Sequence, residues 1–260
     1  MMMISKDQLM TTTNNRYNGS QVGIKRHYHP DNKLLFLSEK ILEWYYNDEL
    51  GIIIIHGQQG YGKSTYACIS CAEVYGHDIN NNRFFYNWSA VKEHIVWTPR
   101  QFIELSKQNK DKEPIIVWDD AAYWLNAMDY RDPLCIAVSK YLEVARTRWA
   151  AIVFTCSDQR QILSKIRGIP HAWTVPITKA PGTASRFNKD YKWKNDRRYA
   201  KLHKAWTSED LKKYGKKGKG GDIFYARMPS NFYNWYKPWR DSFCKMGIEA
   251  VDLAATEDGL

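Results

Sequence analysis

The stretch "IIIIHGQQGYGKSTYA", residues 52–67, decides how this chain folds. Its four isoleucines predict a buried strand, and the glycines that follow allow the backbone to turn tightly. The pattern G-x-x-x-x-G-K-[ST], known as Walker A, is matched by Gly57, Gly62, Lys63 and Ser64. In such a loop several backbone N–H groups point at one phosphate, and the next helix presents its positive N-terminus to the same anion. The stretch therefore predicts a phosphate-binding loop between a strand and a helix.

The loop is expected to hold the phosphates of ATP together with Mg²⁺. In this interpretation Lys63 bridges the β- and γ-phosphates, the Ser64 hydroxyl ligates Mg²⁺, and Thr65 packs at the start of the helix. The residues expected to contact the nucleotide are Gly57, Gln58, Gln59, Gly60, Tyr61, Gly62, Lys63, Ser64 and Thr65. A glycine-rich turn that matches by chance is the alternative, but a strand pattern before the motif and helix-forming residues after it favour the nucleotide site.

A second motif, "IIVWDD" at 115–120, is a buried strand that ends in two carboxylates, the pattern called Walker B. Asp119 is expected to hold Mg²⁺ through water, and Asp120 to polarise the attacking water as a general base. The alternative is a strand that ends at a solvated acidic turn. Two adjacent carboxylates at a buried strand end are costly without a nearby cation, which favours the metal site.

Strand and helix patterns alternate along the first two thirds of the chain. Strands are expected at 52–56, 93–97, 114–120, 150–157 and 172–177. Helices are expected at 31–50, 63–75, 98–108, 132–148 and 158–168, the first capped by Asp31 or Asn32 and the third by Thr98. This alternation predicts an α/β fold with a mostly parallel sheet that has helices on both faces.

Together these motifs resemble the additional-strand class of P-loop ATPases, which includes RecA-like, AAA+ and DNA-pumping ATPases. The resemblance rests on Walker A, an inserted strand near 93–97, Walker B, and a polar-ended strand at 151–157. By general look the chain is similar to small ATPases of archaeal viruses and plasmids, in which a compact core precedes a basic C-terminal extension. One departure is the Asp-Asp end of Walker B, where many members have Asp-Glu, although initiator-type AAA+ proteins and some viral packaging ATPases also have Asp-Asp.

The resemblance implies further site residues. A sensor of the γ-phosphate is implied at the polar end of the fourth strand, with Thr155 preferred over Ser157, and a polar loop without this role is equally weighted. An arginine that reaches a neighbouring subunit's nucleotide in a homo-oligomer is also implied, and the candidates are Arg146, Arg148 and Arg167. Each of them also ends a helix, where the helix dipole alone favours a cation.

The positive charge of the chain is concentrated in its last third. The whole chain has a net charge of +10, and residues 179–245 hold 18 Lys and Arg against 6 Asp and Glu. Aromatic residues alternate with these cations, a composition that suits phosphate contacts and base stacking, so DNA is the expected partner. A solvated basic face over packed aromatics is the alternative. We expect strands within 184–207 and 223–229, a basic loop at 212–222, and a short helix at 230–243 broken near Pro238.

The expected organisation is a loose tail at 1–30, an ATPase core at 31–178, a basic extension at 179–245 and an acidic tail at 246–260. Five scattered cysteines indicate buried thiols in a reducing compartment. The N-terminus lacks an apolar signal region and the isoleucine run is too short to cross a bilayer, so we expect a soluble, cytoplasmic protein without a membrane partner.

Three functions fit this sequence. The first is a DNA-dependent ATPase of a virus or plasmid, in which hydrolysis drives DNA translocation, packaging or replication. The sequence does not separate a packaging motor from a replication factor, although the lack of a recognisable helix-turn-helix weighs slightly against a sequence-specific initiator. The second is a small-molecule or nucleotide kinase. Kinases usually lack a strand between the two Walker strands, whereas "EHIVW" at 93–97 fills that gap here. The third is a nucleotide-gated binding protein with little turnover.

Overall fold

The computed structural model describes residues 33–78, 83–108, 110–169, 172–180, 197–204 and 220–257. Its strands are β1 (Gly51–His56), β2 (His77–Asp78), β3 (Arg83–Phe84), β4 (Ile95–Val96), β5 (Ile116–Trp118), β6 (Ala151–Cys156), β7 (Trp173–Lys179), β8 (Arg197–Lys204) and β9 (Gly220–Tyr225). Its α-helices are α2 (Phe36–Tyr46), α3 (Lys63–Val74), α4 (Trp88–His94), α5 (Pro99–Gln108), α6 (Pro133–Val144), α7 (Ser164–Arg167) and α9 (Ser230–Glu257). Short 3-10 turns are η1 (Ala121–Tyr123), η2 (Ala127–Asp129), η3 (Ala145–Thr147) and η4 (Gln159–Gln161).

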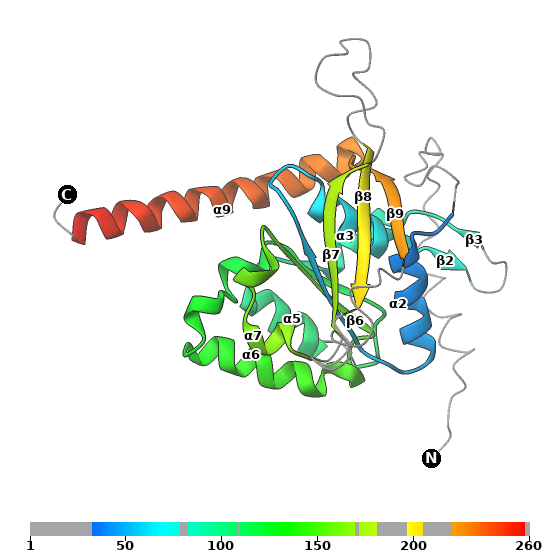
Figure 1. Cartoon of the computed structure of the whole chain (residues 1–260), viewed down its shortest axis with the longest axis horizontal. Helices are drawn as coiled ribbons and strands as arrows, with labels where there is room; N and C mark the ends of the chain where they lie inside the picture. Colours follow the sequence, from blue (N-terminus) through cyan, green and yellow to red (C-terminus); the bar gives the residue numbers. More distant parts are fainter. Residues whose placement is uncertain are drawn as a thin grey trace, which may run out of the picture.

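The strands form a seven-stranded sheet in the order β4-β5-β6-β1-β7-β8-β9, and β2 pairs with β3 in a separate ribbon (Figure 1). The strands from β4 to β7 in that order pair in parallel, whereas β8 and β9 add antiparallel pairs at one edge. The strand β6 lies between β1 and β5, so the strands that carry the two Walker motifs are not neighbours. The predicted α/β fold with a mostly parallel sheet is confirmed.

Helices cover both faces of the parallel strands, and β1 shows how the sequence achieves this. Ile53 and Ile55 belong to one buried cluster, which also contains residues of α2, α3 and α9. Ile52 and Ile54 belong to a second cluster, which contains residues of α5, α6 and α7. Because successive side chains of a strand point to opposite faces, an unbroken isoleucine run fits a strand buried on both sides.

Two predicted helices begin and end differently in the structure. The caps expected at Asp31 or Asn32 lie outside the described residues, and α2 begins at Phe36, after Leu35. The helix expected at 158–168 is divided into η4 and α7. The cap at Thr98 is confirmed, because its hydroxyl accepts a hydrogen bond from the Gln101 backbone N–H at 3.2 Å, and Pro99 is the first residue of α5.

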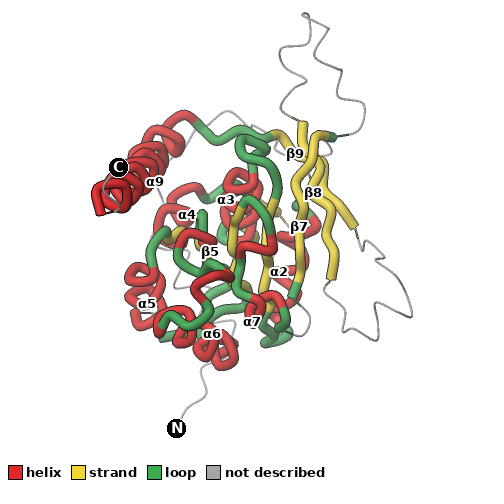
Figure 2. The backbone as a smooth tube through the Cα atoms, turned by 60° about the vertical axis from the view of Figure 1, so that its left-hand side comes forward, coloured by secondary structure: helices red, strands yellow, loops and turns green. Residues whose placement is uncertain are grey.

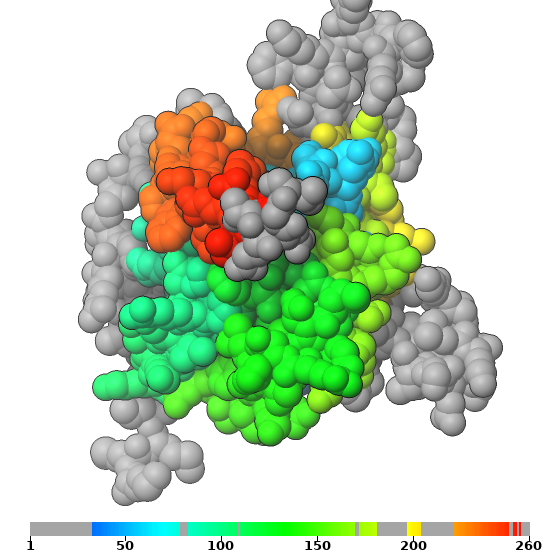
Figure 3. Space-filling view, turned by 90° about the vertical axis from the view of Figure 1, so that its left-hand side faces the viewer, coloured from blue at the N-terminus to red at the C-terminus, as the bar shows by residue number. Residues whose placement is uncertain are grey.

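The C-terminal helix corrects two expectations. The helix does not break near Pro238, and residues 246–257 are not a frayed tail, because α9 continues from Ser230 to Glu257 with Pro238 inside it. An interior proline costs about 3 kcal/mol, but aromatic packing on both sides of it offsets that cost. Before the proline Phe232 is buried, and after it Trp239 stacks on Trp97 with ring centroids 4.9 Å apart. The far half of α9 projects from the body of the protein (Figure 1), and Figure 3 shows the same helix end-on.

The described strands of the basic segment continue the sheet of the core. In the register of β7 with β8, Thr178 lies opposite Tyr199, and β9 pairs with β8 in turn. Asp222 of β9 accepts a hydrogen bond from the Phe36 backbone N–H at 2.8 Å, which ties this edge to α2. The N-terminal tail, most of the expected basic loop and most of the segment before β8 lie outside the described residues, so the division into domains stays a prediction.

Two further findings concern the composition. All five cysteines are free thiols, and only Cys244 is exposed. Among the described helices, not one combines the length and the apolar character that a membrane span requires.

Candidate nucleotide site

The loop between β1 and α3 has a backbone that glycine makes possible. Gly57, Gly60 and Gly62 have φ angles of 146°, 76° and 87°. A Cβ atom on Gly57 would lie 2.7 Å from the Ile177 carbonyl oxygen, and one on Gly62 would lie 2.7 Å from the Ala226 Cβ. Gly62 begins α3 without a side-chain cap, which leaves backbone N–H groups of the first turn available to an anion. This geometry is compatible with the phosphate-binding loop that the sequence predicts.

The two functional side chains after the loop are buried. Lys63 is 6% exposed and Ser64 is 7% exposed. The Lys63 Nζ donates a hydrogen bond to the Gln58 carbonyl at 3.3 Å, so the ammonium group closes over the loop. Burial lowers the pKa of Lys63, and the negative charge of Asp120 opposes this shift. Lys63 is thus a buried cation that is hydrogen-bonded to the Gln58 carbonyl, and a phosphate oxygen can take the place of that carbonyl.

The end of β5 brings the predicted acidic residues next to the predicted sensor. Asp119 is 1% exposed, and its Oδ1 accepts a hydrogen bond from the Thr155 hydroxyl at 2.6 Å. The same Thr155 oxygen accepts from the Asp120 backbone N–H at 2.8 Å. Asp120 itself has a left-handed φ of 49°. Thr155 therefore holds both acidic residues, Asp119 by its side chain and Asp120 by its backbone. It can do so because its strand, β6, lies beside β5 in the sheet, between β5 and β1.

The two carboxylates differ in their surroundings. Burial raises the pKa of Asp120 to about 6, and the negative charge of Asp119 adds to this shift. Arg240 and Lys63 oppose it with their positive charges. A carboxylate with a pKa close to neutrality is suited to accept a proton from water, which is the role that the sequence predicts for Asp120.

Two residues of α9 complete the site, and the sequence did not point to either. The Tyr236 hydroxyl donates a hydrogen bond to Asp119 Oδ2 at 2.5 Å, and it is also hydrogen-bonded by Ser64. One turn later, Arg240 hydrogen-bonds Tyr236 and interacts electrostatically with Asp119 and Asp120. The spacing of four residues places both side chains on one helix face. That signal was hidden because Pro238 between them predicted a break in the helix.

The residues that could hold Mg²⁺ fit that cation. Ser64 and Asp119 come from different elements, and their oxygens meet at a single tyrosine hydroxyl. Magnesium prefers oxygen ligands of this kind, one or two carboxylates together with water and phosphate oxygens. The predicted metal ligands therefore converge, whereas among the described residues no group of three or more His, Cys, Asp or Glu suggests a different metal site.

The other residues predicted to contact the nucleotide are more exposed than Lys63 and Ser64. Gln58, Gln59 and Gly60 are exposed, and Thr65 is half-buried in the first turn of α3. The Tyr61 ring lies 5.9 Å from the Lys179 Nζ and 5.7 Å from the Arg198 guanidinium carbon. These contacts join the loop to the basic edge of the sheet.

The second sensor candidate and the three arginines are placed apart from the carboxylates. Ser157 is exposed, and its carbonyl accepts a hydrogen bond from the Gly57 backbone N–H at 3.1 Å. Arg146 and Arg148 lie just before β6, at the edge of the sheet opposite to the loop. Arg146 contacts Asp48, and Arg148 donates to the Lys110 carbonyl at 2.8 Å.

Arg167, the third arginine, donates to the Ile162 carbonyl at 2.9 Å, within its own segment. The structure does not bring any of the three arginines to the nucleotide site of the same chain, because each is engaged by a local carbonyl or carboxylate. Among the described residues, the arginine that faces the carboxylates is Arg240.

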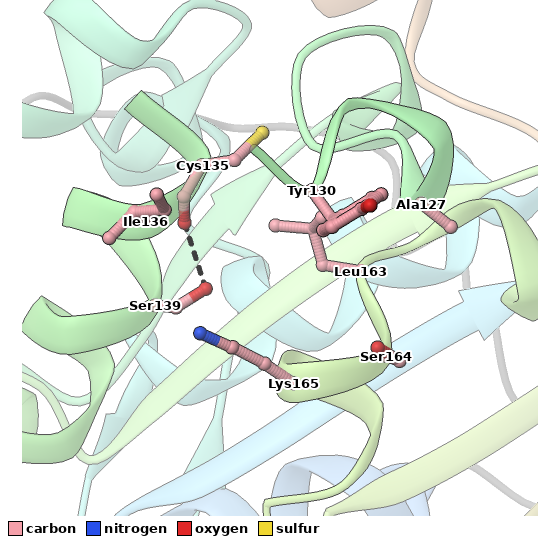
Figure 4. Close-up of a pocket in the computed structure, with 8 residues that line it drawn as sticks. All are labelled: Ala127, Tyr130, Cys135, Ile136, Ser139, Leu163, Ser164 and Lys165. Atoms are coloured by element: carbon pink, nitrogen blue, oxygen red, sulfur yellow. Dashed lines mark hydrogen bonds between the residues drawn. The ribbon is translucent and has the colours of Figure 1, made fainter. Parts of the chain in front are cut away.

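A cavity of about 160 Å³ lies elsewhere, between η2, α6 and α7 (Figure 4). It is lined by Ala127, Tyr130, Cys135, Ile136, Ser139, Leu163, Ser164 and Lys165. The Ser139 hydroxyl donates to the Cys135 carbonyl at 2.8 Å and is therefore engaged within its own helix. None of the lining residues belongs to the predicted nucleotide site.

Comparisons with known proteins point to viruses. The chain is 26% identical over 158 residues to the uncharacterized protein ORF286 of Acidianus two-tailed virus, a match that covers 58% of this chain and 52% of that protein. It is 27% identical over 142 residues to the uncharacterized protein B-251 of Sulfolobus spindle-shape virus 1, covering 52% of this chain and 55% of that protein. The chain thus spans about half the length of the curated relatives it matches.

Among solved structures, the chain is similar to the N-terminal domain of zonular occludens toxin from Neisseria meningitidis, with 14% identity and a TM-score of 0.39. That match covers 72% of this chain and 98% of the other. No family model matches the chain. The similarity to proteins of two archaeal viruses agrees with the resemblance that the sequence motifs suggested.

Proposed function

We propose that this chain is a Mg²⁺-dependent ATPase of a virus or plasmid, and that it couples ATP hydrolysis to the translocation, packaging or replication of DNA. The observation that carries the ATPase proposal is the convergence of Ser64, Asp119 and Asp120 at the phosphate-binding loop. Thr155 holds the two carboxylate residues in a fixed arrangement.

Each residue has a defined part in the proposed reaction. Bound Mg²⁺-ATP supplies the phosphoryl group and a cation that neutralises its charge. The backbone N–H groups at the start of α3 hold the phosphates, and Lys63 exchanges the Gln58 carbonyl for a phosphate oxygen. Asp120 orients water and accepts its proton, and the hydrogen bond from its backbone N–H to Thr155 keeps it in place. Arg240 adds a positive charge beside the carboxylates, where negative charge gathers during the reaction.

The strand order supports an ATPase over the kinase alternative. In this sheet β6 separates β1 from β5, and it supplies Thr155 to the acidic residues. The sequence argument against a kinase named the wrong strand, because the strand expected at 93–97 is reduced to β4 (Ile95–Val96) after the end of α4 and lies at the sheet edge beyond β5. The strand that separates β1 from β5 is β6.

The proposal of a DNA partner is supported by one sheet face with basic residues that is not packed against the described helices α5, α6 and α7. Ala200 and Leu202 of β8 are buried in the cluster under α2 and α3, so Tyr199 and Lys201 point to the other face. The buried cluster under α5, α6 and α7 contains no residue of β7, β8 or β9. Figure 2 shows these three strands at the side of the molecule away from α5 and α6.

The charge of this face suits a polyanion. Arg197, Tyr199 and Lys201 share one side of β8, and two cations with an aromatic ring between them can contact phosphates and a base. The same composition led to the expectation of a DNA partner, and we propose this face of β8 as the surface that contacts it. Arg198, which alternates to the other face of β8 together with Ala200 and Leu202, lies over Tyr61 of the phosphate-binding loop.

The experiment that tests this function is ATP turnover measured without DNA, with single-stranded DNA and with double-stranded DNA. We expect Mg²⁺-dependent release of phosphate that DNA stimulates. Absence of hydrolysis under all three conditions would refute the ATPase, and transfer of phosphate to a small acceptor would identify a kinase. Removal of Arg197 and Lys201 together should lower the DNA affinity and flatten its salt dependence, by about 0.9 in log–log slope for each lost phosphate contact.

A further inference from the structure

We propose that Tyr236 is a conformational switch, whose hydroxyl occupies the place of Mg²⁺ until the Mg²⁺-nucleotide displaces it and moves α9. This inference rests on the proposed nucleotide site and adds to it the element that responds to nucleotide. The ligand that operates the switch is a Mg²⁺-nucleoside triphosphate, whereas a nucleotide without the metal leaves it in place.

The first argument is the position of the hydroxyl. Its hydrogen bonds connect it to Asp119 Oδ2 and to the Ser64 hydroxyl, the two groups predicted to serve the metal. A magnesium ion needs oxygen ligands at about 2.0–2.1 Å and keeps several waters around it. The tyrosine hydroxyl is hydrogen-bonded to both groups, so it lies where an ion shared by Ser64 and Asp119, or the water between that ion and Asp119, would be expected.

The second argument is the chemistry of the hydroxyl. The Tyr236 hydroxyl donates a hydrogen bond to Asp119 Oδ2, and its hydrogen occupies a lone pair of that oxygen that a cation, or a water bound to the cation, would otherwise use. Arg240 hydrogen-bonds the same tyrosine and interacts with both carboxylates. Tyr236 gives Asp119 a hydrogen-bond donor, and Arg240 places a positive charge near it. A bound Mg²⁺ with its water would provide the carboxylate with the same two things. The buried Asp119 carboxylate is therefore satisfied by groups of this chain that can stand in for the metal.

The third argument is that α9 is attached to the body of the protein mainly by its first half. Phe232 and Tyr236 are buried, and Trp239 stacks on Trp97. Beyond these contacts Ile248 and Leu253 are 68% and 62% exposed. The helix α9 has 28 residues and is about 40 Å long at 1.5 Å per residue. If the attached half rotates slightly to withdraw Tyr236, the far end of the helix therefore moves by a larger distance. The projecting half in Figure 1 is thus placed to report the state of the site.

The test uses the full chain and three variants. Tyr236→Phe removes only the hydroxyl and keeps the ring. Tyr233→Phe is the matched control, because Tyr233 lies on the same helix and is 47% exposed. Lys63→Ala is the control for nucleotide binding. The probe is the non-hydrolysable analogue AMP-PNP, titrated by calorimetry in MgCl₂ and again in EDTA. Hydrogen–deuterium exchange of 230–243 is measured with and without the probe.

If Tyr236 is the switch, Mg²⁺-AMP-PNP raises the exchange of 230–243 in the parent. Tyr236→Phe should show raised exchange without any nucleotide. It should also bind Mg²⁺-AMP-PNP about tenfold more tightly than the parent, because one hydrogen bond to a charged group no longer has to be broken. Its affinity in EDTA should stay at the parent value, and Tyr233→Phe should behave as the parent in every measurement.

Three results would overturn the inference, and one of them concerns the function itself. Equal Mg²⁺-AMP-PNP affinity of Tyr236→Phe and the parent, with no exchange change in α9, would show that the tyrosine stays in place. Weaker Mg²⁺-dependent binding by Tyr236→Phe would show that the hydroxyl belongs to the ligands of the metal. Absence of AMP-PNP binding to the parent in both buffers would instead refute the nucleotide site on which the switch depends.

Discussion

The parallel strands have charged residues of the same types at both of their ends. We call the side of the sheet where these strands end the carboxyl edge and the side where they begin the amino edge, and the charged residues have different surroundings on the two sides. At the carboxyl edge, Lys63 and Asp119 are buried and surrounded by groups from α3, β5, β6 and α9. At the amino edge, Lys112 pairs with Asp48 at 2.9 Å and Arg146 approaches the same carboxylate at 3.9 Å. The Asp48 side chain is 61% exposed, so water and salt share these interactions.

The two edges differ in how strongly each charged group depends on its partner. An exposed ion pair contributes about 0–1 kcal/mol, and either partner can be lost with little consequence. A buried charge without its partner is strongly destabilised, so the charged groups at the carboxyl edge hold one another in place. Parallel strands bring their carboxyl ends to one edge, and this is where open α/β sheets bind ligands. Substitutions that are matched across the two edges can test whether this distinction holds.

The largest effect is expected for Lys63→Ala compared with Lys112→Ala. The first removes the cation of the phosphate-binding loop and should abolish ATP hydrolysis and weaken nucleotide binding. The second removes a cation from the amino edge and should leave turnover at the parent rate. Steady-state phosphate release and nucleotide titration measure both. Parent-like hydrolysis by Lys63→Ala would show that the phosphate site is located elsewhere.

A smaller effect, about 10²-fold in turnover, is expected for Asp120→Asn, because the amide cannot accept a proton from water. Nucleotide binding in Mg²⁺ should survive this change. Asp119→Asn should instead impair the Mg²⁺-dependent part of binding, and Asp48→Asn at the amino edge should alter neither. Single-turnover rates and titrations in MgCl₂ and EDTA separate the two roles. Equal loss of binding in both Walker B variants would place Asp120 among the groups that hold the metal.

Little effect, within about twofold in turnover, is expected for Arg146→Ala, because this exposed side chain contacts Asp48 and none of the residues of the candidate site in its own chain. Arg146 contacts Asp48 at the amino edge and does not approach the nucleotide site of its own chain.

We also propose a homo-oligomer, which light scattering can detect. A loss of about 10³-fold by Arg146→Ala, recovered by mixing with Lys63→Ala, would mean that this arginine completes a neighbouring subunit's site.

The last prediction concerns stability, not turnover, and the buried carboxyl near the C-terminal end of α3. Burial raises the pKa of Glu73 to about 8 from an ordinary value of 4.5, against hydrogen bonds from Ser38 and the Leu35 backbone. Between those values the folded chain binds more protons than the unfolded chain. The free energy of unfolding should therefore fall as the pH rises from about 4.5 to 8, by at most about 1.4 kcal/mol per pH unit for this group.

Glu73→Gln is neutral at every pH and should remove this part of the slope. Urea unfolding at several pH values measures it, and Glu39→Gln, at an exposed position of α2, is the control. If Glu73→Gln and the parent lost stability in parallel as the pH rose, the buried carboxyl would not be the cause. A buried acid at this end of α3 would then resemble the exposed charges of the amino edge.

Local sequence patterns were sufficient for several parts of the site. The isoleucine run, the glycine loop and the helix after it depend on neighbouring residues, and the structure contains them as predicted. The acidic pair after β5 and the preferred Thr155 were also identified, and the structure brings them into contact. The interpretation was less accurate where burial competes with a local signal. Pro238 is a strong helix breaker in isolation, but α9 continues through it because rings on both sides are packed.

The sequence by itself determined the first strand, the phosphate-binding loop, the helix after it and the acidic strand end, because backbone preference and hydrophobic periodicity act over a few residues. Only the tertiary structure decided which distant residues share the site. Tyr236 lies 117 positions after the carboxylate that it contacts, and no local pattern encodes that distance. The strand order and the packing of α9 create the contact, and they decide that Arg240 approaches the carboxylates while Arg146 stays at the opposite edge.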